Sequence, residues 1–174
     1  MNSLQIEIPL EMPVDLQLDP DLALDASIDI GMLESGLAVA AAVTTDTRLQ
    51  QAVCVRICGV AESQALNAEY RQQNRPTNVL SFAADIDTDL SKRSALPRQE
   101  IPLGDLAICW PVVEQEARTQ GKCVKDHFTH LYIHGLLHLL GFDHETQAQA
   151  GVMEALEVQI LAQLGLPDPY ESCN

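Results

Sequence analysis

The sequence predicts a mixed α/β (α+β) domain in which a small sheet of about four strands is packed with five or six helices. Two observations lead to this class. Short segments rich in strand-forming residues alternate along the chain with longer segments whose apolar residues recur at helical spacing. The 174 residues also suit one domain and can bury a core without disulfide bonds. We therefore expect residues 1–174 to form a single domain without internal repeats.

The first half of the chain is expected to contain three strands and two helices. Alternating or β-branched residues mark the strands, and apolar residues one helical turn apart mark the helices. The second helix should end before Pro76, because a residue that precedes proline disfavours helical geometry. In chain order the elements are a strand at 4–10, a helix at 33–43, a strand at 52–57, a helix at 63–74 and a strand at 78–82.

The second half is expected to begin with a polar, aperiodic loop at residues 85–99. Three helices then have recognisable boundaries, namely a proline in the first turn, a threonine N-cap or a glycine that can end a helix. The expected elements are a strand at 103–109, a helix from Pro111 to Gln120, a helix from Asp126 to Leu140 closed by Gly141, and a helix from Thr146 to a stop at Gly165.

Charge is unevenly distributed along the chain. The formal net charge is -15, residues 1–47 contain no Lys or Arg, and every basic residue lies between Arg48 and Lys125. A strongly acidic surface disfavours nucleic acid as a partner. Because the basic residues are concentrated in the middle of the chain, that part can still bind a polyanion. The acidic stretch itself is most simply a solvated face.

The cysteines and the amino terminus indicate a reduced, cytoplasmic setting. The five cysteines are scattered and form no C-x-x-C pair. The chain starts without a basic segment followed by an apolar one, and no apolar run approaches the roughly 20 residues that span a bilayer. We therefore expect no membrane association.

All five histidines lie within residues 127–144. His134 and His138 are four residues apart on an expected helix, so their imidazoles lie on one face. Gly141 lets the chain reverse, and His144 can then return to the same point. Three neutral imidazoles with an open fourth position are typical of a catalytic zinc site.

Other interpretations of this window remain open. The histidines could be polar residues of a partly buried helix, or a structural zinc site could take a fourth ligand from Cys109 or Cys123, although no local spacing places either nearby. We expect His127 and His130 to be solvated, with an outer-sphere role as the alternative. A metalloprotease of this spacing has a glutamate base where this chain has Gly135, so the usual machinery for peptide hydrolysis is missing.

Residues 134–144, His-Gly-Leu-Leu-His-Leu-Leu-Gly-Phe-Asp-His, resemble the signature of the YbeY-type endoribonucleases, bacterial proteins of rRNA maturation and ribosome quality control. Further segments agree in order and spacing, namely residues 66–71, 75–82, 104–109 and 168–170. The resemblance covers residues 50–170, whereas the acidic residues 1–45 match only loosely.

The resemblance implies that His134, His138 and His144 bind one zinc ion and that Arg71 is catalytic, its guanidinium clamping a phosphate oxygen. Asp143 is expected either to orient a ligand histidine or to serve the turn. The implied activity is cleavage of single-stranded RNA in maturation of the 16S rRNA 3′ end and in ribosome quality control. The implied partners are rRNA and the ribosome or its small-subunit proteins, with no role for DNA.

Some residues depart from the family pattern. Gln73 and Asn74 stand where charged residues are common, and Ala83 stands where proline often follows Ser-Phe, so the groove should be less basic than usual. Two other functions stay open. One is a zincin-like hydrolase of peptides or small molecules, and the other is a non-catalytic ribosome-associated module with structural zinc.

Overall fold

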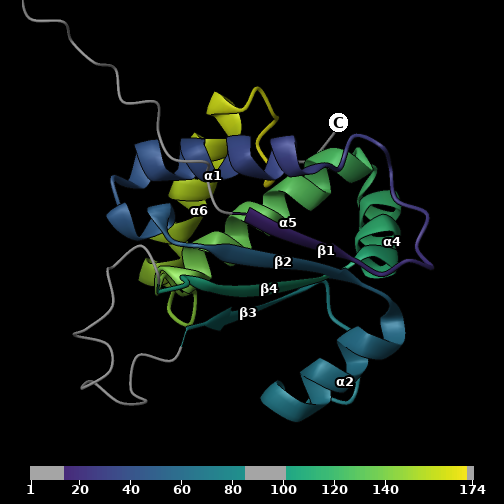
Figure 1. Ribbon diagram of the computed structural model, residues 1–174. Helices are drawn as coiled ribbons and strands as arrows, with labels where there is room; N and C mark the ends of the chain where they lie inside the picture. Colours follow the sequence, from purple (N-terminus) through teal and green to yellow (C-terminus); the bar gives the residue numbers. More distant parts are fainter. Residues whose placement is uncertain (1–13, 85–100, 172–174) are drawn as a thin grey trace, which may run out of the picture.

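The computed structural model describes residues 14–84 and 101–171, and in this part a mixed sheet is packed between helices (Figure 1). The strands are β1 (Val14–Leu18), β2 (Val53–Cys58), β3 (Val79–Ala83) and β4 (Gly104–Cys109). The helices are α1 (Ile30–Thr44), α2 (Val60–Arg71), α4 (Trp110–Gln120), α5 (Val124–Leu139) and α6 (Gln147–Gln163), with a short 3-10 helix at Thr47–Gln50.

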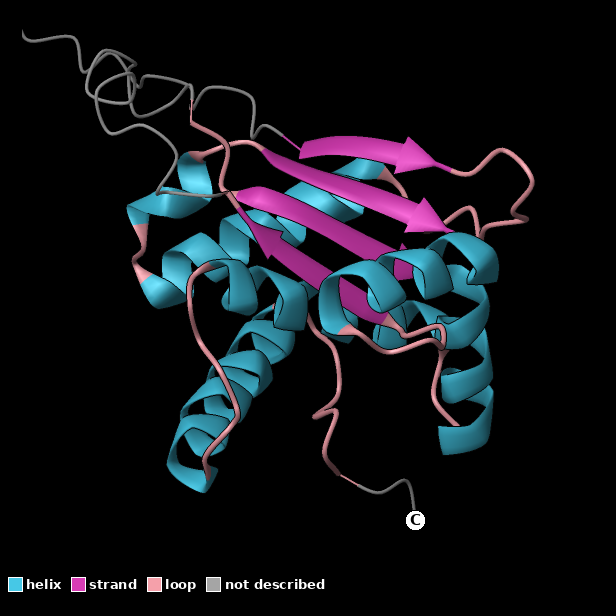
Figure 2. Cartoon of the chain, turned by 90° about the horizontal axis from the view of Figure 1, so that it is seen from below, coloured by secondary structure: helices cyan, strands magenta, loops and turns pink. Residues whose placement is uncertain are grey.

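The four strands lie side by side in the order β1-β2-β4-β3 (Figure 2). Strands β1, β2 and β4 are parallel to one another, whereas β3 runs antiparallel to β4 at the edge of the sheet. At mid-sheet Leu106 of β4 pairs with Val55 on one side and with Ser81 on the other. Helices α1, α5 and α6 lie on one side of the sheet and α2 lies on the opposite side (Figure 1).

Helix α5 is the central helix of the core. Phe128 and Ile133 are fully buried, and the hydroxyl of the buried Tyr132 donates to the carbonyl of Leu33 in α1 at 3.0 Å. A Cβ atom on Gly135 would lie 2.9 Å from a methyl group of Leu106, so the absence of a side chain lets α5 approach the sheet closely. The helix that carries most of the histidines is therefore a rigid platform.

Most of the expected elements are confirmed, with boundaries shifted by a few residues. The expected strand at 4–10 and the expected loop at 85–99 lie outside the described residues. The N-terminal strand that the structure does describe, β1, was not expected. It is a five-residue edge strand in an acidic stretch, and each of its residues pairs with one of β2.

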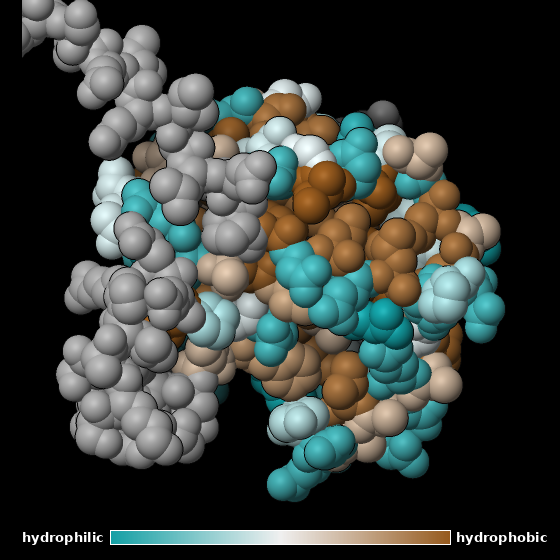
Figure 3. All heavy atoms as spheres, in the orientation of Figure 1, coloured by the Kyte–Doolittle hydropathy of each residue, from teal (hydrophilic) through white to brown (hydrophobic). Residues whose placement is uncertain are grey.

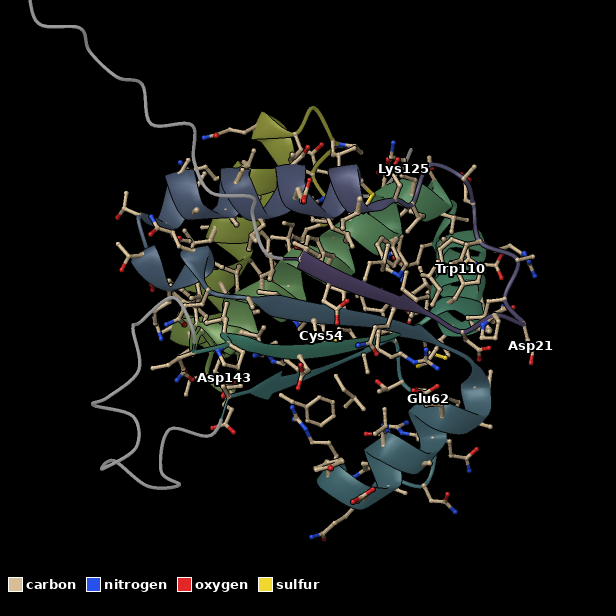
Figure 4. The ribbon with its side chains drawn as sticks, viewed as in Figure 1. Asp21, Cys54, Glu62, Trp110, Lys125 and Asp143 are labelled. Carbon is tan, nitrogen blue, oxygen red and sulfur yellow. The ribbon has the colours of Figure 1, made fainter. Side chains whose placement is uncertain are left out.

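The surface seen in the direction of Figure 1 interleaves hydrophilic and hydrophobic side chains (Figure 3). Among the described helices none is both long enough and apolar enough to cross a bilayer. Trp110, at the start of α4, lies at one end of the sheet (Figure 4). Asp143, beyond the end of α5, lies at the opposite end.

Candidate metal centre

The structure brings His134, His138 and His144 together. Their candidate ligand nitrogens all lie within 4.8 Å of one another. The Nε2 atoms of His134 and His138, one turn apart on α5, are separated by 3.0 Å. The ring of His144 is centred 5.4 Å from that of His134 and 5.0 Å from that of His138. The arrangement predicted from sequence spacing is thus present in space.

The turn after α5 delivers the third histidine. Gly141 has a φ of 86°, a left-handed conformation that residues with a Cβ rarely adopt. The N–H of Phe142 then donates back to the carbonyl of Leu137 at 3.0 Å. Arg48, from the 3-10 helix, donates to the carbonyl of Leu140 at 3.1 Å and so fixes the same turn from outside. The chain therefore reverses at a defined point, and this reversal places His144 beside His134 and His138.

Asp143 makes a turn contact, since its Oδ1 accepts the backbone N–H of His144 at 2.8 Å. The carboxylate that reaches the second nitrogen of a triad histidine is a different one. Oε1 of Glu157, on α6, lies 2.7 Å from Nδ1 of His134. Of the two roles considered for Asp143, the observed contact is the local one.

Glu157 was not singled out from the sequence, although a signal exists. It is four residues after Met153 and three before Ile160, so it lies on the apolar stripe of α6, and it is fully buried. Burial would raise the pKa of Glu157, but hydrogen bonds from His130, His134 and Tyr170 outweigh this effect and hold the pKa at about 2. A glutamate on a buried helix face indicates such partners, because an unpaired buried carboxylate is unfavourable.

The expectation that His127 and His130 are solvated is wrong. His127 is 4% exposed, and its Nε2 lies 2.8 Å from Oε2 of Glu116 on α4. Burial lowers the pKa of His127, and the hydrogen bond to Glu116 opposes this shift. Nε2 of His130 lies 2.8 Å from Oε2 of Glu157. Both histidines are enclosed because α4 and α6 pack against α5 and each brings a carboxylate.

The donor set fits a metal ion. Nitrogens that share a tetrahedral zinc ion at about 2.0–2.1 Å lie about 3.4 Å apart, which is compatible with the spacing of the triad. Burial, together with the nearby His134 and His144, lowers the pKa of His138 and favours the neutral form that binds metals. Within residues 14–84 and 101–171, no cysteine belongs to the cluster. Cys123 precedes α5, about 16 Å of helix axis from His134.

A second group of candidate ligand atoms comprises His130, His134 and Glu157. It shares His134 with the triad, and its carboxylate oxygens already accept hydrogen bonds from both histidines. The three-histidine group is therefore the better candidate, because its nitrogens are not paired with carboxylates on the side where they meet.

A cleft of about 710 Å³ opens over the triad, and Arg71 and Arg75 line it together with the three histidines. Arg71 is the last residue of α2. Two buried polar side chains hold the connection from α2 to β3, since Ser63 donates to the carbonyl of Thr77 at 2.9 Å and Asn67 donates to that of Arg75 at 2.7 Å. Two guanidinium groups therefore lie along the same cleft as the candidate metal ligands.

Glu116 is the one carboxylate among the described residues that line this cleft. It accepts a hydrogen bond from the side-chain amide of Asn78 at 3.1 Å, in addition to that from His127. His127 precedes His134 by seven residues, which is about 10 Å of helix axis. Glu116 therefore contacts the part of α5 that lies two turns before the triad.

The residue that follows the first triad histidine does not face the metal centre. Gly135 is buried against the sheet, and its carbonyl accepts a hydrogen bond from Oγ of Ser81 at 3.2 Å. A Cβ atom here would lie 2.9 Å from a methyl group of Leu106 and 3.4 Å from Oγ of Ser81. A side chain at this position would therefore start against the sheet.

The fold and this centre define a class, that of small mixed α/β proteins with a three-histidine candidate metal site at the end of a buried helix. The family model described as endoribonuclease YbeY matches residues 31–165. The chain therefore belongs to the endoribonuclease YbeY family.

Individual relatives agree with this assignment. The endoribonuclease YbeY of Halorhodospira halophila is 53% identical over 117 residues, which cover 67% of this chain and 73% of that protein. The protein of the same name from Pseudomonas entomophila is also 53% identical over 117 residues, covering 67% of this chain and 69% of that protein. The solution structure of TM1509 from Thermotoga maritima shares the fold, with a TM-score of 0.52, 20% identity and coverage of 91% of this chain and 99% of that one.

Proposed function

We propose that this chain is a zinc-dependent endoribonuclease that cleaves single-stranded rRNA in the cytoplasm, acting in maturation of the 16S rRNA 3′ end and in ribosome quality control. Its partners would be the ribosome or small-subunit proteins, with no role for DNA or membranes. One observation carries the chemical part of the proposal. The three histidines and Arg71, which come from different helices and a turn, line a single cleft. Family membership supports RNA as the substrate.

His134, His138 and His144 would hold the ion, and a zinc ion bound there supplies a Lewis acid beside the scissile phosphate. The chain itself supplies the positioning. Arg71 would bind a non-bridging phosphate oxygen through paired N–H donors and stabilise the negative charge that develops at phosphorus. Arg75, in the same cleft, would bind a neighbouring phosphate.

The nucleophile in this scheme is either water or the 2′-hydroxyl of the RNA, and the products distinguish the two. Attack by the 2′-hydroxyl leaves a 2′,3′-cyclic phosphate, whereas attack by water leaves a linear phosphate. The position directly after His134 in the sequence is Gly135, so the glutamate base that metalloproteases carry there is missing. Glu116 contacts α5 two turns away and is better placed to bind an adjoining nucleotide.

The test compares purified wild-type protein with Arg71→Glu and with Arg118→Glu, a matched charge reversal at an exposed position near the end of α4. The substrates are a single-stranded RNA, its duplex and the corresponding DNA, and bound metal is quantified in each preparation. We expect Arg71→Glu to cut single-stranded RNA at least about 100-fold more slowly while it retains zinc, as expected for loss of a charge-stabilising group. Equal activity in wild type and Arg71→Glu would remove Arg71 from the mechanism, and absence of RNA cleavage by zinc-loaded wild type would sink the proposal.

A further inference from the structure

We propose that Glu157 is a positioning residue for the candidate metal ligand His134, and that Tyr170 of the C-terminal segment holds Glu157 in place. The inference rests on the proposed metal site and adds how the geometry of that site is fixed. It extends the functional part of the chain to a segment some 26 residues beyond His144.

Both carboxylate oxygens of Glu157 are engaged. Oε1 accepts from Nδ1 of His134 at 2.7 Å, and Oε2 accepts from Nε2 of His130 at 2.8 Å and from the hydroxyl of Tyr170. The Glu157 side chain is 1% exposed, so water does not replace these donors. Because three donors bind this buried carboxylate, they fix its orientation.

The contact with Oε1 decides which nitrogen of His134 can bind a metal. A neutral imidazole carries a single N–H, and a carboxylate at Nδ1 keeps the proton there. The lone pair then lies on Nε2, the atom that faces Nε2 of His138 at 3.0 Å. Glu157 thus selects the metal-binding tautomer and fixes the rotation of the ring, as carboxylates behind metal-bound histidines do.

Tyr170 contacts the same group in two ways. Its hydroxyl donates to Glu157, and its ring packs edge-on against the ring of His130, with centroids 5.5 Å apart. The backbone around it is also held, because Lys122 donates to the carbonyl of Pro169 at 2.6 Å and the N–H of Tyr170 donates to Oδ1 of Asp168 at 2.8 Å. Residues 168–170 therefore pack behind the metal centre, on the side away from the cleft that Arg71 lines.

The experiment measures zinc affinity directly, by competition of the metal-free full-length chain with a chromophoric chelator. The variants are Glu157→Ala, Glu157→Gln and Tyr170→Phe. Glu154→Gln, one turn earlier on an exposed part of α6, is the control for the glutamate, and Tyr70→Phe, at an exposed tyrosine of α2, is the control for loss of a hydroxyl. Thermal unfolding of each metal-free variant reports whether the fold survives.

We expect Glu157→Ala to weaken zinc binding by about 10- to 100-fold. Glu157→Gln keeps one acceptor oxygen and should lose less, and Tyr170→Phe should weaken binding about fivefold, the effect of one lost hydrogen bond. Both controls should bind zinc like the wild type. Variants that melt earlier when metal-free but bind zinc as tightly as the wild type would overturn the inference, since Glu157 would then be structural only.

Two further readouts separate the alternatives. Nitrogen-15 NMR of the metal-free wild type should show His134 protonated at Nδ1, and protonation at Nε2 would contradict the proposed role. A stoichiometry of two zinc ions that falls to one in Glu157→Gln would also overturn it, because Glu157 would then be a ligand. None of these measurements uses RNA, so weakened zinc binding in Glu157→Ala beside a wild type without ribonuclease activity would sink the proposed function and leave the inference standing.

Discussion

Helix α5 carries four histidines, and its two halves use them differently. In the first half, His127 and His130 each contact a carboxylate, from α4 and α6 respectively. In the second half, Glu157 contacts His134 through Nδ1, which leaves Nε2 of His134 facing Nε2 of His138 at 3.0 Å. The residue type and the helix are the same, so the groups that neighbouring elements bring to each ring decide its role.

The difference has a simple electrostatic meaning. A histidine beside a carboxylate is satisfied as a hydrogen-bond donor, and Glu116 satisfies His127 in this way. Two imidazole nitrogens that face each other can share at most one proton without repulsion, and a cation that accepts both lone pairs resolves the conflict. The second half of α5 therefore presents imidazole nitrogens to a metal ion, whereas His127 and His130 in the first half contact carboxylates of neighbouring helices.

The largest effect that this comparison predicts is at His138. We expect His138→Ala to lose zinc binding and to cleave RNA at least about 100-fold more slowly, because two imidazoles bind zinc far more weakly than three. Bound zinc and cleavage are both measured, and circular dichroism checks that the fold is retained. An unfolded His138→Ala chain would instead indicate structural zinc.

His127 provides the contrasting variant. We expect His127→Leu to lower the free energy of unfolding by about 1–3 kcal/mol, because Glu116 loses a hydrogen-bond partner, and to leave zinc affinity unchanged. Urea unfolding of the metal-free protein measures the first quantity, and chelator competition measures the second. A large loss of zinc affinity in this variant would contradict the division of α5 into two halves.

The turn that carries His144 into the centre gives a smaller effect. Gly141→Ala places a Cβ on a left-handed residue, which costs about 1–2 kcal/mol of stability, although open space surrounds the position. We expect thermal unfolding to show this loss and zinc binding to weaken as the turn adjusts. Gly151→Ala, inside α6 and also in open space, is the matched control and should not destabilise the protein. A Gly141→Ala variant as stable as wild type would show that the turn tolerates a side chain.

The smallest predicted effect is the pH dependence that His127 contributes. Burial lowers its pKa, the hydrogen bond to Glu116 opposes this, and electrostatic interactions with His130 and Lys122 add to the lowering. The unfolded chain gains a proton on this residue near its usual pKa of 6.5, whereas the folded chain resists protonation. The free energy of unfolding should therefore fall as pH drops below about 6.5 and be level above it. Metal-free His127→Leu should show a shallower fall than metal-free wild type, and identical slopes would contradict the shift.

The triad was predictable because its geometry is local. His134 and His138 are one helical turn apart, and Gly141 indicates the chain reversal that brings His144 back to them. The helices and the inner strands were predictable for a similar reason, since their apolar periodicity lies within a single segment. Arg71 was identified by resemblance, and the structure places it on the wall of the same cleft.

The partners of the other histidines were not predictable, because they depend on how helices pack. Glu116 lies 11 residues from His127, and Glu157 lies 27 and 23 residues from His130 and His134. The sequence does not say which faces of these helices meet. Glu157 on the apolar stripe of α6 was the one available signal. Tyr170, which completes the cluster, lies beyond the last helix, where no periodicity constrains its position.

X-ray absorption spectroscopy of the zinc-loaded protein tests the central claim most directly. The account predicts three imidazole nitrogens and one further light atom from solvent at about 2.0–2.1 Å from zinc. A sulfur ligand at about 2.3 Å, or a shell with fewer than three imidazoles, would contradict an open three-histidine centre.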